Sequence, residues 1–228
     1  MPKTFAIFCL FVVFCLGAAA QTASPTMSIV EEDGTETEEV SYEGSAPLQV
    51  IFRANPEDAD GYSAYYEWRF TDETSGETFL VRYEEETTYT FRESGSYSIE
   101  LYITYVNGSD SIEYSLDDAF TITITESKLE VPNAFTPNGD GVNDIFKVKD
   151  GYESILSFEA AVFNRWGKKL YEWTDIAGGW DGKSGGRDVP DGAYYLVIKA
   201  RGADGVNYNI KKVINLLRGY TDSVSSSQ

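Results

Sequence analysis

Histidine is missing from this chain of 228 residues, and its two cysteines, Cys9 and Cys15, both lie near the N-terminus. Without histidine there is no Ser-His-Asp or Cys-His catalytic arrangement and no histidine-ligated metal. Beyond Cys15 the chain has no residue for a structural disulfide, a zinc–thiolate site or a thiol nucleophile. Most common enzyme chemistry is therefore excluded.

Positive charge is also scarce, because 18 Lys and Arg face 37 Asp and Glu and the formal net charge is -19. Phosphate backbones repel so acidic a chain, so we expect no nucleic-acid binding. Residues 28–127 hold 24 acidic and 4 basic residues, whereas residues 128–228 hold 13 of each. This shift predicts two domains of about 100 residues that meet near residues 126–130.

The longest apolar run, Phe5 to Leu16, is shorter than the ~20 residues that a membrane-spanning helix needs. Lys3 precedes this run, and Gly17-Ala18-Ala19-Ala20 follow it. A charged start, an apolar middle and a small-residue cleavage site are typical of a secretory signal peptide. We expect residues 1–20 to be removed and the exported chain not to span a membrane.

Short apolar or alternating segments predict β-strands in both halves, and no segment has a sustained helical period. The clearest alternation runs from Ser96 to Tyr105 and reaches Asn107-Gly108, a strong hairpin signal. Further strands are predicted at 47–52, 65–70, 111–114, 119–125, 193–200 and 206–217. The predicted fold class is all-β, with two tandem immunoglobulin-like β-sandwich domains at 21–127 and 128–218 and a flexible tail at 219–228.

Two segments of the first half resemble polycystic kidney disease (PKD) repeats. Trp68-Arg69-Phe70-Thr71-Asp72 is similar to their Trp-x-Phe-Gly-Asp core, although Thr71 replaces the glycine. Thr88 to Phe91 and Gly95 to Ile99 are similar to the Tyr-x-Phe and Gly-x-Tyr-x-Val segments of the same repeats. We expect Trp68 and Tyr89 to be core residues, and the fold alone identifies no ligand.

The second half carries five ordered motifs: Val131 to Asp144, Phe163 to Gly167, Gly179 to Gly182, Val189 to Tyr195 and Lys211 to Arg218. In this order they closely resemble the gliding-motility-associated C-terminal domain of Bacteroidetes, the type B sorting signal of the type IX secretion system. The residues that carry the resemblance are Pro132, Asn133, Phe135, Pro137, Asn138, Gly139, Asp140, Gly141, Asn143, Asp144, Phe163, Asn164, Arg165, Trp166, Gly167, Trp180, Asp181, Gly182, Pro190, Asp191, Gly192, Tyr194, Tyr195, Lys211, Leu216 and Arg218. Lys212 departs from the family, which commonly has glycine there.

The loop 138–144 is dense in turn-forming residues and contains four oxygen-bearing side chains, Asn138, Asp140, Asn143 and Asp144. Part of it resembles a calcium loop, but an EF-hand needs a glutamate at position twelve, where Lys149 stands. A turn network without metal is favoured, and a Ca²⁺ site is the alternative. No other cofactor is expected.

Other residues of the second half have structural interpretations. Trp166 and Trp180 are expected to be packing residues, and Arg165, Lys168 and Lys169 a solvated basic cluster that could also orient the two domains. The strands at 193–200 and 206–217 form a hairpin, and the last strand is expected at a sheet edge, open to pairing or recognition.

Only carboxylate-based catalysis is left to this composition, as in glycoside hydrolysis. The acidic runs at 31–33, 36–39 and 84–86 are typical of solvated faces, and a sandwich of about 100 residues offers little room for a cleft. We expect no enzyme.

The resemblance implies contact with type IX secretion components and with an outer-membrane β-barrel of the PorP/SprF type. An accessory or adaptor protein at the outer membrane is therefore the favoured function. The alternative is a small cell-surface adhesin or carbohydrate-binding protein whose PKD-like domain binds a glycan or another surface ligand.

Overall fold

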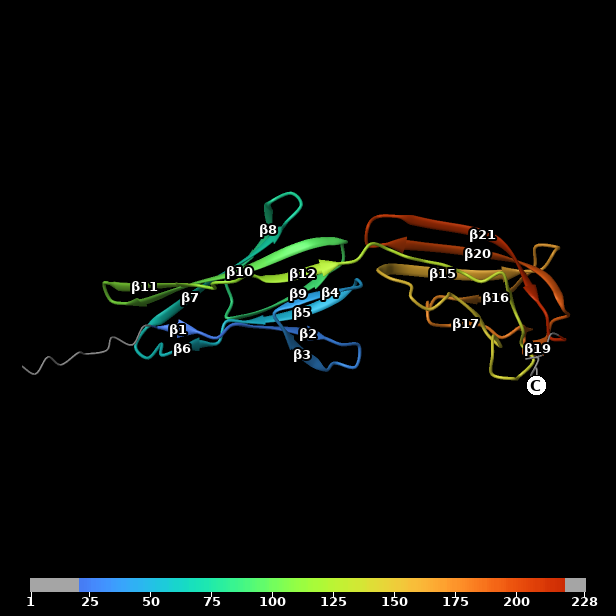
Figure 1. Cartoon of the computed structure of the whole chain (residues 1–228), viewed down its shortest axis with the longest axis horizontal. Coiled ribbons are helices and arrows are strands. Elements are labelled where there is room, and N and C mark those ends of the chain that lie inside the picture. Colours follow the sequence, from blue (N-terminus) through green and yellow to red (C-terminus); the bar gives the residue numbers. More distant parts are fainter. Residues whose placement is uncertain (1–20, 220–228) are drawn as a thin grey trace, which may run out of the picture.

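The computed structural model describes residues 21–219, so the expected signal peptide at 1–20 and residues 220–228 of the expected tail lie outside it. Within that range every regular element is a β-strand, and none is a helix that could cross a membrane. The strands form two bodies that follow one another along the long axis of the molecule (Figure 1). The all-β prediction with two sandwich-like bodies is confirmed.

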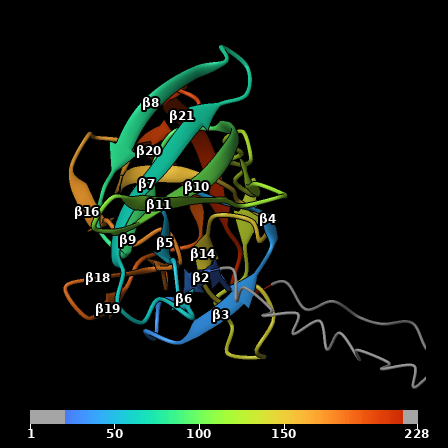
Figure 2. The same cartoon turned by 90° about the vertical axis from the view of Figure 1, so that its left-hand side faces the viewer.

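The first body contains a four-stranded sheet in the order β3-β2-β5-β9 and a larger sheet in the order β4-β12-β10-β7-β8, with β11 paired to β10. β3 and β8 lie at opposite margins of this body when it is viewed end-on (Figure 2). The strands of the four-stranded sheet are β2 (Thr26–Val30), β3 (Glu36–Glu39), β5 (Leu48–Arg53) and β9 (Glu86–Phe91). Those of the larger sheet are β4 (Ser41–Gly44), β7 (Ser63–Asp72), β8 (Glu77–Arg82), β10 (Gly95–Asn107), β11 (Asp110–Ser115) and β12 (Phe120–Ile124). β1 (Thr22–Ala23) and β6 (Pro56–Glu57) form a separate pair.

Alternation along β10 decides which side chains enter the core of the first body. Every second residue from Tyr97 to Tyr105 is buried, while the residues between them are partly exposed. The predicted hairpin is confirmed, because Asn107 pairs with Asp110 across the turn Gly108-Ser109. Trp68 is fully buried, as predicted, and its indole N–H donates to a backbone carbonyl at 3.1 Å. Tyr89 is only half-buried and packs against the edge of the core.

The second body is built around a five-stranded sheet in the order β13-β21-β20-β15-β16. Its strands are β13 (Ala134–Phe135), β15 (Ile155–Phe163), β16 (Lys169–Trp173), β20 (Gly192–Gly202) and β21 (Asn207–Leu216). Two short pairs accompany this sheet: β14 (Phe146–Lys147) with β17 (Gly179–Trp180), and β18 (Lys183–Ser184) with β19 (Arg187–Asp188). β20 and β21 form the predicted hairpin.

The prediction that the last strand is an open sheet edge is wrong for the C-terminal end of β21. β13 pairs there in parallel with Asn215 and Leu216, so this part of β21 is an inner strand. The physical reason is a long-range return of the chain, which brings a segment some eighty residues upstream onto the end of β21. Lys212 helps to hold the returning segment on β21, because its ammonium donates a hydrogen bond to the carbonyl of Val131 at 3.0 Å.

The same type of tyrosine hydrogen bond occurs in both bodies, near the start of their longest strands, β10 and β20. The hydroxyl of Tyr97 donates to the carbonyl of Glu93 at 2.9 Å, and that of Tyr194 donates to the carbonyl of Pro190 at 2.6 Å. Each tyrosine stands two residues after a glycine with positive φ. A tyrosine that bonds back to the backbone a few residues upstream is a mark of immunoglobulin-like sandwiches.

A hydrogen-bonded joint connects the two bodies. Ser154 of the second body is 1% exposed, and its hydroxyl accepts the backbone N–H of Ala46 at 3.2 Å and contacts the hydroxyl of Thr125 at 3.0 Å. Ala203, also from the second body, belongs to the buried core of the first, and its carbonyl accepts the N–H of Ser94 at 3.2 Å. The two bodies therefore share buried contacts on both sides of the connecting segment.

The connecting segment itself is fixed by Ser127. Its backbone N–H and its hydroxyl both donate to the carboxylate of Asp204, at 3.0 and 2.8 Å. The hydroxyl of Tyr208 lies 2.9 Å from that of Ser127. Because these groups come from the β20–β21 hairpin, this hairpin holds the linker on the second body.

Candidate functional site

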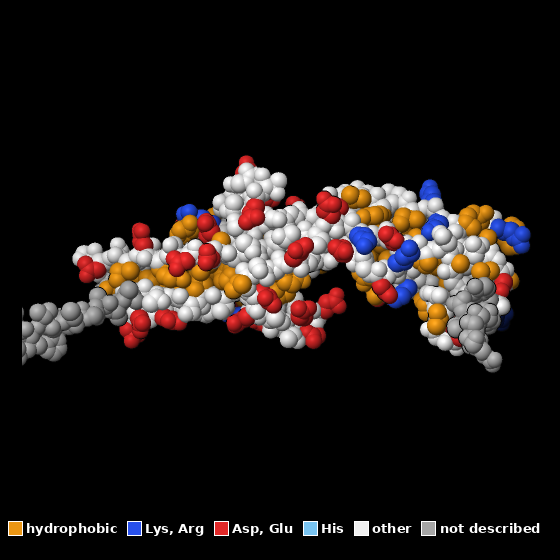
Figure 3. All heavy atoms as spheres, viewed as in Figure 1, with side chains coloured by type: hydrophobic (Ala, Val, Ile, Leu, Met, Phe, Trp, Pro, Cys, Tyr) orange, Lys and Arg blue, Asp and Glu red, His pale blue; other side chains and the backbone are white. Residues whose placement is uncertain are grey.

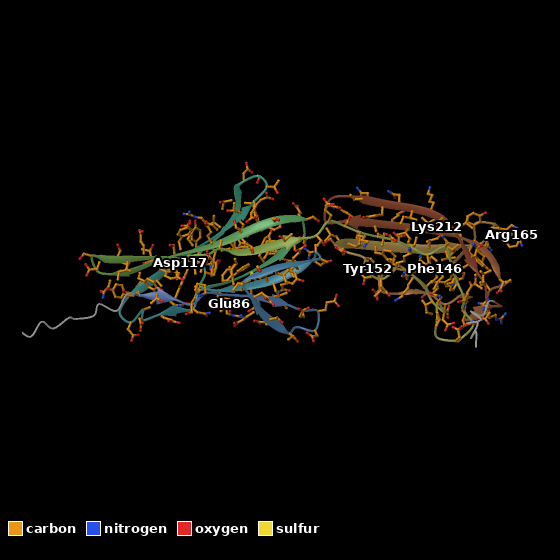
Figure 4. The ribbon with its side chains drawn as sticks, viewed as in Figure 1. Glu86, Asp117, Phe146, Tyr152, Arg165 and Lys212 are labelled. Carbon is orange, nitrogen blue, oxygen red and sulfur yellow. The ribbon has the colours of Figure 1, made fainter. Side chains whose placement is uncertain are left out.

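Most loops that carry the sorting motifs meet at one end of the second body, which we call the distal end. Figure 4 shows Arg165 at this end, away from the first body. The turns at 164–167, 181–182 and 190–192, the loop 138–144 and the end of β21 contribute to it. The joint lies at the opposite end of the same sheet, because the paired strands β20 and β21 extend from the distal end to the joint.

Arg218 ties several of these loops together. Its guanidinium donates to the carbonyl of Gly182 at 2.8 Å and to that of Val189, and it lies 3.6 Å from the Asp191 carboxylate. The same carboxylate accepts the backbone N–H of Arg218 at 2.9 Å. Residues that the sequence showed as separate motifs are thus one hydrogen-bonded unit.

The position of Gly182, next to the Arg218 guanidinium, favours glycine for two reasons. Its φ is +78°, in the region that favours glycine. A Cβ at this position would lie 2.8 Å from the Arg218 guanidinium, 3.0 Å from Leu216 and 3.1 Å from Pro137. A side chain at this position would therefore separate the last strand from the Asp181-Gly182 turn.

The aromatic motif residues form the core beneath the distal end. The Trp180 ring lies 5.4 Å from that of Phe135 and 5.2 Å from that of Tyr194, centroid to centroid, and all three residues are buried. Leu216 is also fully buried. Trp180 is therefore a packing residue, as predicted.

Trp166 contradicts its prediction, because it is 77% exposed. It stands on a tight turn in which the Asn164 side-chain oxygen accepts the N–H groups of Trp166 and Lys168, both at 3.0 Å. Gly167 completes the turn with φ +81°. Residues 164–168 connect β15 to β16 outside the sheet, which leaves most of the indole exposed to solvent.

A pocket of about 530 Å³ adjoins this exposed turn. Arg165 stacks on the Trp166 ring, with 4.6 Å between the guanidinium carbon and the ring centroid. Tyr195, 48% exposed, and Pro190 line the same pocket. The pocket combines exposed aromatic surface with one basic and one acidic side chain, Arg165 and Asp191, a combination that suits a protein-docking surface.

The loop 138–144 forms a closed network of turns. Both carboxylate oxygens of Asp144 accept backbone N–H groups, from Gly139 at 2.7 Å and from Gly141 at 2.8 Å. Those two bonds hold the pKa of Asp144 below its usual value. The carboxylate oxygens of Asp140 accept the N–H of Val142 and the side-chain amide of Asn138.

These bonds bear on the calcium alternative. A Ca²⁺ ion takes six to eight oxygen ligands, and here all four carboxylate oxygens of the loop already accept hydrogen bonds within it. Among residues 21–219, no group of three or more acidic, cysteine or histidine side chains is placed to hold a metal ion. A turn network without metal stays the prediction for this loop, and a Ca²⁺ site stays the alternative.

The remaining motif residues have local roles. Asn133 accepts the N–H of Asn215 through its carbonyl, and Asp181 accepts the N–H of Lys183 at 3.0 Å. Phe163 ends β15, and Lys211 is exposed on β21. Figure 4 places Arg165 at the distal end, and Lys168 and Lys169 belong to the same β15–β16 hairpin, so this basic cluster does not orient the first domain. Sequence reasoning missed the joint, since Ser127 and Asp204 carry no motif.

These features define a two-domain β-sandwich protein whose second domain concentrates its motif residues at one end. Residues 129–216 match the family model of the CHU_C type IX secretion signal domain, and residues 37–117 match that of the PKD domain. The chain therefore carries a type IX secretion signal domain toward its C-terminus, preceded by a PKD domain. Such a signal domain directs secretion across the outer membrane to the cell surface by the type IX machinery.

The chain is distantly similar to three solved structures. Dimeric latent PorU from Porphyromonas gingivalis is 12% identical, with a TM-score of 0.26 over 86% of this chain and 20% of that chain. A tetra-tandem repeat from the extending region of a large adhesion protein is 12% identical, with a TM-score of 0.28 over 87% and 68%. The Bacteroides ovatus protein SGBP-B, solved with a mixed-linkage heptasaccharide, is 10% identical, with a TM-score of 0.26 over 77% and 42%.

The chain thus spans about a fifth of the PorU chain. No curated protein matches it.

Proposed function

We propose that the protein is a non-enzymatic adaptor of the type IX secretion apparatus, held at the outer membrane by a β-barrel of the PorP/SprF type. In this proposal the barrel contacts the distal end of the signal domain, and the PKD domain faces another component. The observation that carries the proposal is the exposed Arg165–Trp166 turn beside its pocket, at the end remote from the PKD domain.

Three properties support an adaptor. Trp166, 77% exposed, and the Arg165 guanidinium stacked on it stand beside a pocket, and Trp and Arg are the residue types enriched at the energetic centres of binding interfaces. The joint holds the two domains together through buried contacts, so that both ends keep a fixed relation. Charge also distinguishes the two bodies: on the face that Figure 3 shows, most charged side chains of the first body are acidic, whereas the second body carries both signs.

The test is capture of outer-membrane proteins from the native host by the tagged full chain. We expect a barrel of the PorP/SprF type in roughly stoichiometric amount, and Trp166→Ala should remove most of it. Tyr83→Ala is the matched control, because Tyr83 is a 67% exposed aromatic residue of the PKD domain and its loss should leave capture unchanged.

Two results would contradict the adaptor role. One is capture of no barrel by the unaltered chain. The other is a gene deletion that leaves both the secretion of other cargo and gliding motility intact, because an adaptor of the apparatus is needed for more than its own export.

A small surface adhesin is the second candidate function. The observation that favours it is an aromatic-lined pocket of about 480 Å³ in the PKD domain, where rings of Phe79, Tyr89 and Tyr97 meet. An adhesin would lose cell or glycan binding when the PKD domain is deleted, and secretion of other cargo would continue.

A further inference from the structure

The aromatic-lined pocket of the PKD domain lies where its two sheets diverge. β8 and β9 are each the last strand of their sheet, and the pocket is lined from both. The Phe79 ring, on a residue that is 42% exposed, lies 5.8 Å from that of Tyr89 and 5.6 Å from that of Tyr97. The three rings form one wall, with Phe79 at its solvent side.

Carboxylates surround this aromatic wall. Asp72, Glu77 and Glu93 line the pocket, and Arg92 is the only basic residue in the lining. Asp72 is engaged with the turn after β7, because it accepts the N–H of Ser75 at 2.8 Å. Among the residues that the structure describes, the Glu77 and Glu93 carboxylates form neither a hydrogen bond nor an ion pair.

The negative field of these groups reaches the rings. Burial, and after it the charges of Glu93 and Asp72, raise the pKa of the Tyr97 hydroxyl to about 12. Burial and then Glu93 also raise the pKa of Tyr89. An aromatic face in a negative field attracts a cation twice, through the ring quadrupole and through the carboxylates.

We propose that this pocket binds an arginine or lysine side chain from a basic segment of a partner protein. A guanidinium or ammonium group lies over the Phe79 ring and forms ion pairs with Glu77 and Glu93. The proposal does not depend on the adaptor role, because it concerns the other domain. The net charge of −20 over residues 28–127 adds long-range attraction for the same kind of partner.

A neutral sugar fits these observations less well. Stacking of sugar rings uses a flat aromatic face, whereas the Phe79 ring is inclined by 53° to Tyr89 and by 67° to Tyr97. The two carboxylates without partners would also gain less from neutral hydroxyl groups than from a cation. A cationic side chain uses both features at once.

The experiment titrates the full chain with fluorescein-labelled hexa-arginine and follows fluorescence anisotropy at about 150 mM salt, where distant charges are screened. We expect Phe79→Ala to weaken binding about fivefold and Glu77→Gln with Glu93→Gln to weaken it by a similar factor. Glu38→Gln with Glu39→Gln removes the same charge from the exposed strand β3 and should change affinity less than twofold.

Each alternative outcome is decisive. If the Glu77/Glu93 and the Glu38/Glu39 double variants lose equal affinity, hexa-arginine binds the overall negative charge of the domain. The proposal would then be wrong. It would also be wrong if a soluble glucan oligosaccharide bound with sensitivity to Phe79→Ala while hexa-arginine did not, since the pocket would then be a sugar site. Tyr65→Ala, a 63% exposed aromatic residue elsewhere on β7, controls for general loss of aromatic surface. The glutamine variants keep the test valid if Phe79→Ala does not fold.

Discussion

Ser154→Ala tests whether the joint contributes to the stability of the whole chain. The hydroxyl of Ser154 accepts the N–H of Ala46 and contacts Thr125, so it links the second domain to two segments of the first. Ala46 is 5% exposed, and the substitution would leave its N–H buried without an acceptor. An unsatisfied buried donor costs about 1–3 kcal/mol, and we expect a loss of about 2 kcal/mol in the free energy of unfolding.

The assay is urea denaturation of the full chain followed by circular dichroism, together with its thermal melting. For a chain of this size, 2 kcal/mol corresponds to a melting temperature lower by about 4–8 °C. Ser157→Ala is the matched control, because Ser157 is exposed on β15 and its loss should cost less than about 0.5 kcal/mol.

A double-mutant cycle with Thr125→Val then isolates the contact across the joint. The two hydroxyls lie 3.0 Å apart, so we expect a coupling free energy of at least about 0.5 kcal/mol. If Ser154→Ala costs no more than Ser157→Ala, the joint does not stabilise the chain, and the fixed relation between the domains loses its support.

Three further predictions concern the distal end. Gly182→Ala should lower stability by more than about 2 kcal/mol in thermal denaturation, because its Cβ would meet three groups, whereas Gly185→Ala has open space and should cost only about 1 kcal/mol of backbone strain; equal effects would contradict the packing explanation. Asp144 has a lowered pKa, so its contribution to stability is present above about pH 4 and is lost as the pH falls through the folded-state value; Asp144→Asn should therefore flatten the acid side of the stability profile, and an unchanged profile would refute this. Isothermal titration with Ca²⁺ should give no heat, because the loop 138–144 already satisfies its carboxylates, and a dissociation constant below about 1 mM would show that the calcium alternative is correct.

Local patterns in the sequence determined the strands and much of the core. Alternation from Ser96 to Tyr105 specifies which face of β10 is buried, because successive side chains of a strand point to opposite faces. Gly108 specifies the hairpin, since it opens the two-residue turn after Asn107 with a φ of +62°. The ordered motifs between residues 131 and 218 indicated the signal domain without any structure, and the family model of that domain matches residues 129–216.

Only the tertiary structure decided what depends on contacts between distant segments. The burial of an aromatic residue is set by its neighbours in space, so Trp180 is in the core and Trp166 is exposed, although both belong to similar motifs. The edge predicted at the last strand is covered by a segment that returns from Ala134 and Phe135. The joint pairs Ser127 with Asp204, 77 positions apart, and no local pattern predicts such a contact.

The charge of the chain was likewise determined partly by the sequence and partly by the tertiary structure. The count of acidic residues assigned the negative charge to the first half, because composition needs no coordinates. The structure decided which carboxylates remain available, leaving Glu77 and Glu93 beside an exposed ring while Glu36 and Glu86 pair with Arg53. Sequence fixes how much charge a domain carries, but folding decides which of those charges are neutralised within the protein and which face a partner.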